Sequence, residues 1–343
     1  MKVFIALCVI GLALAVPLEK KWPIPRQDGS VSWLTENEAR LEALPELMAF
    51  NTKKLDSIKY FLYTPYNLDT AQEIIEGDLE SLKKSNFNAK HPTRISVHGW
   101  GGKWDNSQNM LIKNSYLKNG RNEVYNVIIV DWSVYSDSSN YYASKSKCSV
   151  AGAALGKLID WMHSEVGLSF ASLDLIGHSL GAHVVGFAGK TVTQGKIHTI
   201  YGLDPAMPLF SYDNPKTRLA STDANYVETI QTNGGLKGFY SPIGKASFYP
   251  NGGKHQPGCG TDVDGACAHA RSVTYFAEAV KMGLKNDFLP DKCGSFDLLK
   301  ENKCDIHVYG IRMADPYNYG RADGVYYLKT NSKAPYGMGV SGE

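Results

Sequence analysis

Ser179 lies in the stretch LDLIGHSLGAHVVG, residues 173–186, between Gly177 and Gly181. The apolar residues before the serine are typical of a buried strand, and the small and apolar residues after it are typical of a helix. Gly-x-Ser-x-Gly between a strand and a helix is the pattern of a nucleophilic serine on a sharp turn. The helix would point its free N–H groups and partial positive charge at the site. The stretch therefore predicts a serine nucleophile beside an anion-stabilising helix terminus.

A serine hydroxyl needs a base, and the base needs a carboxylate that orients it. In hydrolases with this turn, the acid follows the serine along the chain and the histidine follows the acid. Asp204 comes at the end of the strand-like run HTIYGLDP, residues 198–205, so we predict it as the acid. The alternative is a turn-capping aspartate in an Asp-Pro step. Asp223 and Asp131 are weaker candidates.

The histidine must come later in the chain, where there are three candidates: His255, His269 and His307. His269 follows Cys267 by two residues and precedes a helix-like stretch, so a crosslink at that cysteine would hold its loop. His255 lies in a Gly/Pro-rich loop and His307 in a strand-like stretch. We predict His269 as the base. His178 and His183, on either side of the serine, are expected to pack or hydrogen-bond.

A tetrahedral intermediate needs two hydrogen-bond donors for its oxyanion. The N–H of Leu180, at the start of the predicted helix, is one candidate. The loop VHGWGG, residues 97–102, follows an early strand-like run and has the His-Gly form that supplies a second donor, and Trp100 N–H is our candidate. The alternative for this loop is an ordinary glycine-rich turn.

These residues need a scaffold that brings strand ends together. Short apolar runs typical of strands occur at 58–65, 93–100, 126–133, 173–179, 198–205 and 226–232, with a Tyr-rich one at 325–330. Helix-like stretches lie between several of them, at 149–166, 180–192 and 269–283. Nearly continuous apolar strands that alternate with helices predict an α/β fold, with a mostly parallel central sheet and helices on both faces.

The chain has 343 residues and a formal net charge of +2. This charge is too small to indicate a protein that binds nucleic acid. Residues 1–15 have the charged start, the apolar stretch and the Ala-x-Ala end of a signal peptide, with a buried strand as the alternative. That stretch is too short to span a membrane, so we expect no transmembrane segment. Residues 16–55 are polar and Pro-containing and are expected to form a loose leader or pro-segment. Residues 56–343 are expected to form a single domain.

Six cysteines are present, and Cys8 falls in the predicted signal peptide. Export favours disulfides, and the last four cysteines form two close pairs, which predicts Cys259–Cys267 and Cys293–Cys304. Cys148 is left over and is expected to be a buried thiol beside the 149–166 helix. Zinc is the alternative for four cysteines, but their spacings are not Cys-x-x-Cys.

Five motifs occur here in one order: HGWGG, GHSLGAH, GLDPA, YPNGGKHQPGC and CAHARS. Together they resemble the animal pancreatic lipase family, within the α/β-hydrolase fold, over roughly residues 58–335. The resemblance implies ester hydrolysis on glycerolipids, with Ser179 as nucleophile, Asp204 as orienting acid and His269 as base. It also implies that the Cys259–Cys267 bridge closes the lid loop over the active site.

The sequence departs from that family in two ways. The larger members carry a C-terminal β-sandwich that binds a protein cofactor, and this chain ends before it, so no such partner is expected. The loop NPKTRLASTD, residues 214–223, has Lys216 and Ala220 where the family's calcium ligands are acidic, so we expect no metal and no cofactor. In its short lid and single domain, the chain resembles insect digestive lipases and wasp-venom phospholipases A1.

The leading hypothesis is a secreted serine ester hydrolase that acts on acyl glycerolipids at a lipid–water interface. The short loop between Cys259 and Cys267, GTDVDGA, cannot form an amphipathic helix that seals the site, so we expect a site open to water and phospholipase A1-type (sn-1) activity. The alternatives are a triacylglycerol lipase of the same fold and a non-catalytic lipid-binding or yolk-type storage protein. The expected location is extracellular, with the gut lumen as one candidate.

Overall fold

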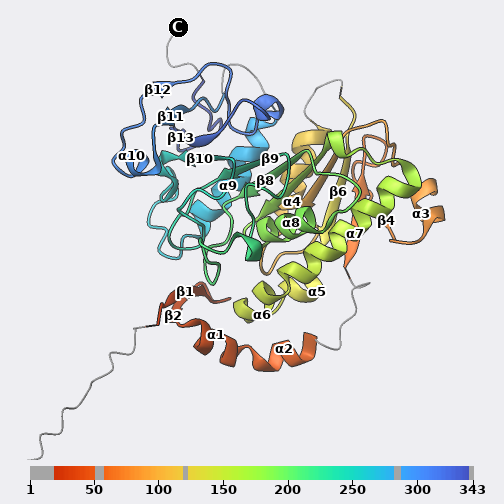
Figure 1. The fold of residues 1–343 in the computed structure, drawn as a ribbon, viewed down its shortest axis with the longest axis horizontal. Helices are drawn as coiled ribbons and strands as arrows, with labels where there is room; N and C mark the ends of the chain where they lie inside the picture. Colours follow the sequence, from red (N-terminus) through yellow and green to blue (C-terminus); the bar gives the residue numbers. More distant parts are fainter. Residues whose placement is uncertain (1–18, 51–57, 119–122, 282–286, 340–343) are drawn as a thin grey trace, which may run out of the picture.

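The computed structural model describes residues 19–50, 58–118, 123–281 and 287–339 (Figure 1). The predicted signal peptide, residues 1–15, lies outside the described residues. Among the helices that are described, none combines the length and the apolar character that crossing a membrane requires.

An 11-stranded sheet forms the centre of the molecule, in the order β12-β11-β13-β10-β9-β8-β7-β5-β6-β3-β4. Its seven middle strands, from β13 to β6, pair in parallel, and antiparallel strands extend both edges. The predicted mostly parallel sheet is thus confirmed. The strands are β3 (Lys59–Tyr63), β4 (Gln72–Ile74), β5 (Thr93–Val97), β6 (Asn126–Asp131), β7 (Leu173–His178), β8 (Thr199–Leu203), β9 (Tyr226–Ile230), β10 (Ala246–Pro250), β11 (Asp291–Cys293), β12 (Ile306–His307) and β13 (Gly324–Leu328).

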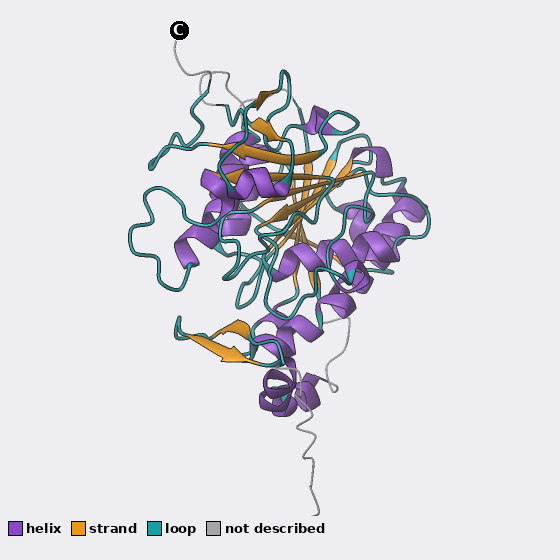
Figure 2. Cartoon of the chain, turned by 60° about the vertical axis from the view of Figure 1, so that its left-hand side comes forward, coloured by secondary structure: helices purple, strands orange, loops and turns teal. Residues whose placement is uncertain are grey.

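Helices cover both faces of this sheet (Figure 2). On one face α7 (Cys148–Val166) packs on α8 (Leu180–Thr191), and on the other α4 (Ser107–Leu117) packs on α9 (Ala266–Ala279). Side chains alternate along the strands, so Leu175 enters the core under α7 and α8 while Ile176 enters the core under α4 and α9. Burial on both faces explains why the middle strands are almost continuously apolar.

Shorter helices lie at the ends of the strands and along the edges of the sheet. They are α3 (Leu79–Lys84), α5 (Ser133–Ser136), α6 (Tyr141–Ser146) and α10 (Phe296–Lys300). Single 3-10 turns occur at Phe170–Ser172, Pro215–Thr217, Asn251–Gly253 and Pro316–Asn318.

Residues 19–50, which we call the N-terminal segment, are more regular than the sequence analysis expected. β1 (Trp22–Pro25) and β2 (Val31–Leu34) form a separate antiparallel hairpin, and α1 (Glu36–Glu42) and α2 (Leu44–Phe50) follow it. From the sequence we expected a loose leader over residues 16–55, whereas the described part of it forms regular strands and helices. Two physical causes order the segment: Trp22 and Ile24 are buried, and Thr35 and Glu38 form a capping box at the start of α1.

The loop between β8 and β9 is held by an internal cation. The Lys190 ammonium donates to both carboxylate oxygens of Asp223 at 2.5 Å and to the Arg218 carbonyl at 2.8 Å. Asp223 also accepts the Ala220 N–H at 2.9 Å. The family resemblance implies calcium in this loop, but the residues do not fit it. The Asp223 carboxylate already has a cationic partner, and the side chain of Ala220 offers no ligand.

The cysteines are arranged as the sequence suggested. The structure joins Cys259 to Cys267 and Cys293 to Cys304. Cys148 is a free, buried thiol at the start of α7, as predicted. Burial raises the pKa of this thiol to about 12, so it stays protonated and inert.

The Lys190 ammonium gives a prediction about stability. Lys190→Met should lower the free energy of unfolding by roughly 2–3 kcal/mol, because it removes the ammonium that is hydrogen-bonded to the buried Asp223 carboxylate. Urea unfolding measures this effect. In the unmodified protein, EDTA should leave the unfolding midpoint unchanged, and a clear drop on chelation would contradict our assignment of the lysine as the cation of this loop.

Candidate active site

Ser179 occupies the sharp turn between β7 and α8. Its backbone has φ 57° and ψ −122°, a conformation that non-glycine residues rarely adopt, and its N–H donates to the Leu203 carbonyl at 3.0 Å. The glycines on either side are required by close contacts. A Cβ atom at Gly177 would lie 2.3 Å from the Gly181 carbonyl oxygen, and one at Gly181 would lie 2.3 Å from the Val97 carbonyl oxygen. The strained turn carries the serine side chain to the carboxyl edge of the sheet.

Asp204 follows β8 directly and is fully buried. Its Oδ1 atom accepts the backbone N–H groups of Thr232 at 2.8 Å and Asn233 at 3.0 Å, just beyond the end of the neighbouring strand β9. Its Oδ2 atom lies 2.5 Å from Nδ1 of His269. The carboxylate is therefore held from one side by backbone and presents its other oxygen to the imidazole.

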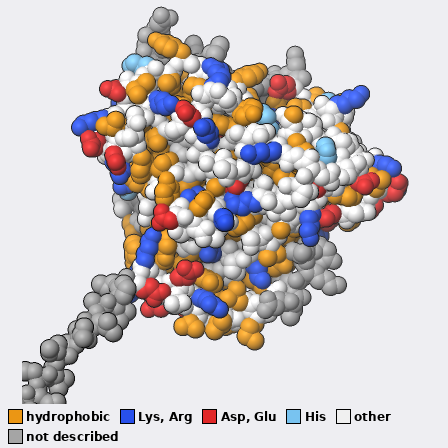
Figure 3. Space-filling view, viewed as in Figure 1, with side chains coloured by type: hydrophobic (Ala, Val, Ile, Leu, Met, Phe, Trp, Pro, Cys, Tyr) orange, Lys and Arg blue, Asp and Glu red, His pale blue; other side chains and the backbone are white. Residues whose placement is uncertain are grey.

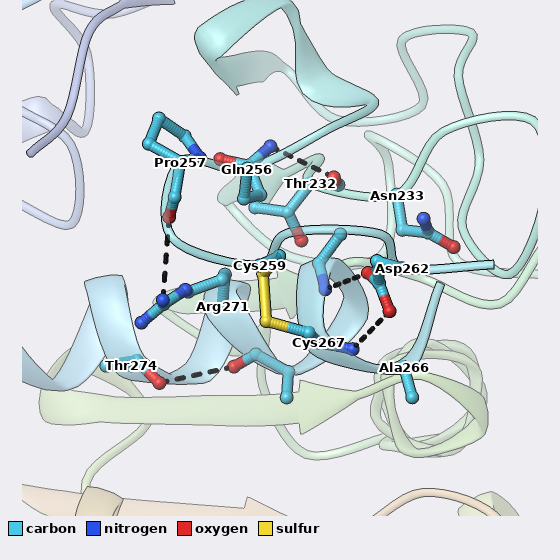
Figure 4. Close-up of a disulfide and its surroundings, with 12 residues drawn as sticks. Thr232, Asn233, Gln256, Pro257, Cys259, Asp262, Ala266, Cys267, Arg271 and Thr274 are labelled. Atoms are coloured by element: carbon cyan, nitrogen blue, oxygen red, sulfur yellow. Dashed lines mark hydrogen bonds between the residues drawn. A yellow bond between two sulfur atoms is a disulfide. The ribbon is translucent and has the colours of Figure 1, made fainter. Parts of the chain in front are cut away.

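His269 lies in the first turn of α9, and its N–H donates to the Gly265 carbonyl. The start of this helix is anchored by the Cys259–Cys267 loop (Figure 4). Within the loop, the Asp262 carboxylate accepts the N–H of Cys267 at 3.1 Å and of Ala268 at 2.7 Å. This cap satisfies free N–H groups of the helix and holds the helix turn that carries His269.

His178 and His183 flank the serine without joining the Asp204–His269 pair. Nε2 of His178 donates to the His269 carbonyl at 3.2 Å, and the two rings lie 4.5 Å apart. Burial and the neighbouring imidazole of His269 hold the pKa of His178 well below its usual value, so this ring stays neutral. His183 bonds the Ala206 carbonyl and the Leu219 N–H, and burial lowers its pKa to about 3. Both histidines therefore have structural contacts, as expected.

The loop after β5 borders the same site. Trp100 lines the cavity together with Gly99, and its indole N–H donates to the Ser138 carbonyl at 2.8 Å. The ring of His98 is buried, with Nδ1 donating to the Gly99 carbonyl and Nε2 accepting the Trp132 N–H. Leu180 is the first residue of α8, where backbone N–H groups have no partner within the helix. Of the two predicted oxyanion donors, Trp100 thus belongs to the loop after β5 and Leu180 to the first turn of α8, and both lie beside Ser179.

The other candidates have different partners. Asp223 is bonded to Lys190, and His307 pairs with Asp291 at the edge of the sheet. Asp131 lies 3.5 Å from the ring of His98. Among the predicted residues, the structure brings Ser179 and His269 to one cavity, and Asp204 directly behind the histidine.

The cavity over Ser179 is small. It measures about 190 Å³, below the roughly 300–1,000 Å³ of small-molecule pockets. Pro25 of the N-terminal hairpin forms part of its wall together with Tyr141 and Lys237, and Ser179 is only 8% exposed. From the sequence we expected a site open to water because the disulfide loop is short, and we did not foresee that the N-terminal hairpin contributes to the cavity wall.

Sequence reasoning missed several residues of the site, among them Thr232, Asn233 and Pro25. Thr232 and Asn233 could have been found from their position at the end of the strand-like run 226–232, because neighbouring parallel strands end at the same edge. Pro25 carries no signal in the sequence, since its place in the cavity wall depends on packing between distant parts of the chain.

Comparison with known proteins agrees with this arrangement. The family model described as Lipase matches residues 32–336. Pancreatic triacylglycerol lipase of Mus musculus is 34% identical over 296 residues, which cover 79% of this chain and 60% of that protein. Pancreatic lipase-related protein 2 of Cavia porcellus is 32% identical, over 79% of this chain and 61% of that protein. Lipoprotein lipase of Mus musculus is 31% identical, over 81% of this chain and 63% of that protein.

The chain thus spans about 60% of the length of these relatives. The family match covers the described central sheet and the helices on its faces, and the serine lies on the strand–turn–helix that is typical of α/β hydrolases. The chain therefore belongs to the lipase family that includes pancreatic and lipoprotein lipases, and it has the α/β-hydrolase fold.

Proposed function

We propose that this protein is a serine ester hydrolase that releases fatty acids from acyl glycerolipids. The observation that carries the proposal is the 2.5 Å contact between His269 and the buried Asp204 at a cavity lined by Ser179. The names of the relatives, which are pancreatic and lipoprotein lipases, support a lipid ester as the substrate class.

In the proposed mechanism, the imidazole of His269 takes the proton of the Ser179 hydroxyl as the oxygen attacks the carbonyl carbon of the ester. The carbonyl π-electrons move to oxygen, and the N–H groups of Trp100 and Leu180 stabilise this oxyanion. The intermediate collapses, the C–O bond to the alcohol breaks, and His269 protonates the departing alkoxide. A water molecule, deprotonated by His269, then attacks the acyl-serine, and collapse of that intermediate frees the fatty acid and returns the proton to Ser179.

Asp204 supports this cycle from behind the histidine. Because Thr232 and Asn233 already bond its Oδ1 atom, Oδ2 is the oxygen left for Nδ1 of His269. The proton of the neutral imidazole is then held on Nδ1, which leaves Nε2 free to act as the base. The same carboxylate stabilises the imidazolium that forms when His269 takes the serine proton.

The finer proposal is phospholipase A1-type action on the sn-1 ester. The loop between Cys259 and Cys267 is short and polar, and the one sizeable apolar side chain in it, Val263, is 83% exposed to solvent. Such a loop leaves room beside the scissile ester for a polar head group. The second candidate is a triacylglycerol lipase, which the name of the mouse pancreatic relative favours.

The third candidate, a non-catalytic lipid-binding or yolk-type storage protein, is disfavoured because the serine, the histidine and the carboxylate are all present. We further propose that the protein acts outside the cell, as its two disulfides suggest. Residues 56–343 are proposed to be one hydrolase domain, preceded by the signal peptide at 1–15 and by a leader or pro-segment at 16–55.

Ser179→Ala should reduce kcat on a glycerolipid ester by at least about 10³-fold, because no other group can form the acyl-enzyme. Hydrolysis is followed by fatty acid release, with the melting temperature as the control for folding. A variant that keeps more than about a tenth of the original kcat would contradict the assignment of Ser179 as the nucleophile.

Asp204→Asn and His269→Ala should each slow the same chemical step, so their effects should not multiply with that of Ser179→Ala. Steady-state kinetics of the single and double variants measure this. We expect each double variant to be little slower than Ser179→Ala alone. Independent, multiplying losses would mean that the partner residue acts elsewhere.

Substrate preference separates the two lipase candidates. If the short disulfide loop leaves space for a head group, fatty acid release from phosphatidylcholine should be at least as fast as release from emulsified triolein. Both rates are measured with the same enzyme preparation, and Ser179→Ala serves as the blank. Activity confined to triolein would favour the triacylglycerol lipase.

A further inference from the structure

An apolar stripe faces outward on the N-terminal segment. Leu41, Leu44 and Met48 are 66%, 45% and 72% exposed, and they follow one another at spacings of three and four residues along α1 and α2. Trp33 of the adjoining strand β2 is 59% exposed. Single exposed apolar residues are ordinary, but a stripe of large ones at helical spacing is typical of an interaction surface. In Figure 3, hydrophobic side chains gather at the lower edge of the molecule, where Figure 1 shows these two helices.

The stripe is not the face by which these helices pack on the protein. Ala39, Ala43 and Phe50 are buried on the other side, and the Phe50 ring meets Tyr135 of α5 edge-on at 5.4 Å. A surface helix usually needs one apolar face, which it buries against the core. The two helices therefore carry a second apolar face that their own packing does not use.

The hairpin before these helices places the stripe beside the cavity. Pro25 lines the cavity with Ser179, and the Gln27 amide lies 3.5 Å from the Ser138 carbonyl that also accepts the Trp100 indole N–H. At the hairpin turn, a Cβ atom on Gly29 would lie 3.8 Å from the Asp264 carboxylate.

Asp264 belongs to the disulfide loop, so the hairpin runs from one rim of the cavity to the other. Its carboxylate pairs at 3.3 Å with Lys237, which also lines the cavity. In Figure 1 the hairpin lies to the left of α6, and α1 and α2 continue from it below α5 and α6. The apolar stripe and the cavity mouth are thus at the same end of the molecule.

The net charge of the N-terminal segment indicates which kind of partner its apolar stripe can bind. Residues 19–50 have two more carboxylates than basic groups. Such a surface does not attract nucleic acid or strongly anionic membranes, which bind clusters of lysine and arginine. An apolar stripe in a slightly acidic segment fits a neutral or zwitterionic lipid surface, into which large apolar side chains insert.

We propose that Trp33, Leu41, Leu44 and Met48 form the face by which this protein binds a neutral or zwitterionic lipid surface. The proposal rests on the proposed function in one respect, namely that the lipid surface is the one that holds the substrate. Binding through this face brings the surface against the hairpin that borders Ser179, so the substrate enters at the bound side. Neither the disulfide loop nor the central sheet takes part in this contact.

The test measures binding in a full-length Ser179→Ala background, so that lipid is not consumed. Co-sedimentation with phosphatidylcholine vesicles compares Leu41→Ser/Met48→Ser with a matched control pair, Ile306→Ser/Tyr309→Ser. The control residues are 46% and 94% exposed and lie at β12 and just after it, far from the N-terminal segment in Figure 1. We expect the first pair to weaken binding at least about tenfold and the control pair to change it less than twofold.

Three results would overturn the proposal. One is equal binding by both pairs. Another is binding that requires phosphatidylserine vesicles. The third is a parent protein that self-associates and becomes monomeric in the first pair with no change in lipid binding, which would make the stripe a contact between copies of the chain.

A second measurement covers the case in which the double variant does not fold. In the Ser179→Ala protein, vesicles of brominated phosphatidylcholine should quench tryptophan fluorescence, and Trp33→Phe should remove most of that quenching. Trp161→Phe, on α7, is the control and should leave the quenching unchanged. Quenching that survives Trp33→Phe would contradict the proposal. Because neither readout needs turnover, failure of the proposed hydrolysis would be seen separately, in assays of the unmodified protein.

Discussion

The contact between the Asp204 carboxylate and the His269 imidazole joins two parts of the chain that are 65 residues apart. This contact depends on several independent features of the fold. β9 must lie beside β8 for Thr232 and Asn233 to bond the other carboxylate oxygen. Gly238 must have no side chain, because a Cβ atom there would lie 2.3 Å from the carboxylate. The active site therefore depends on the order of the strands in the sheet.

The histidine is positioned from the opposite side. Its helix begins at the disulfide loop, where Asp262 bonds free N–H groups of the first turn. A short crosslinked loop has few conformations, so it holds the start of a helix more firmly than an open loop of the same length. In this protein the bridge thus supports His269, whereas none of the residues between the two cysteines lines the cavity. Pro25 of the N-terminal hairpin does line it.

Features that depend on neighbouring residues could be predicted from the sequence. The strand, the two glycines and the helix around Ser179 lie within residues 173–186, so local periodicity and turn chemistry were sufficient. Features that depend on pairing between distant strands could not. Thr232 and Asn233 required the order of β8 and β9. The N-terminal hairpin was missed because Pro23 and Pro25 argue against a strand, whereas a two-stranded hairpin tolerates proline where a central strand does not.

The central claim is that Ser179 is activated by the His269–Asp204 pair. Labelling with a fluorophosphonate, followed by mass spectrometry of the modified peptide, tests it most directly, because the reagent reacts only with a serine that its base has activated. The account predicts one label per chain, on Ser179, and labelling at least about 10²-fold slower in folded Asp204→Asn. Labelling of a different serine, or labelling of Ser179 at an unchanged rate in Asp204→Asn, would contradict it.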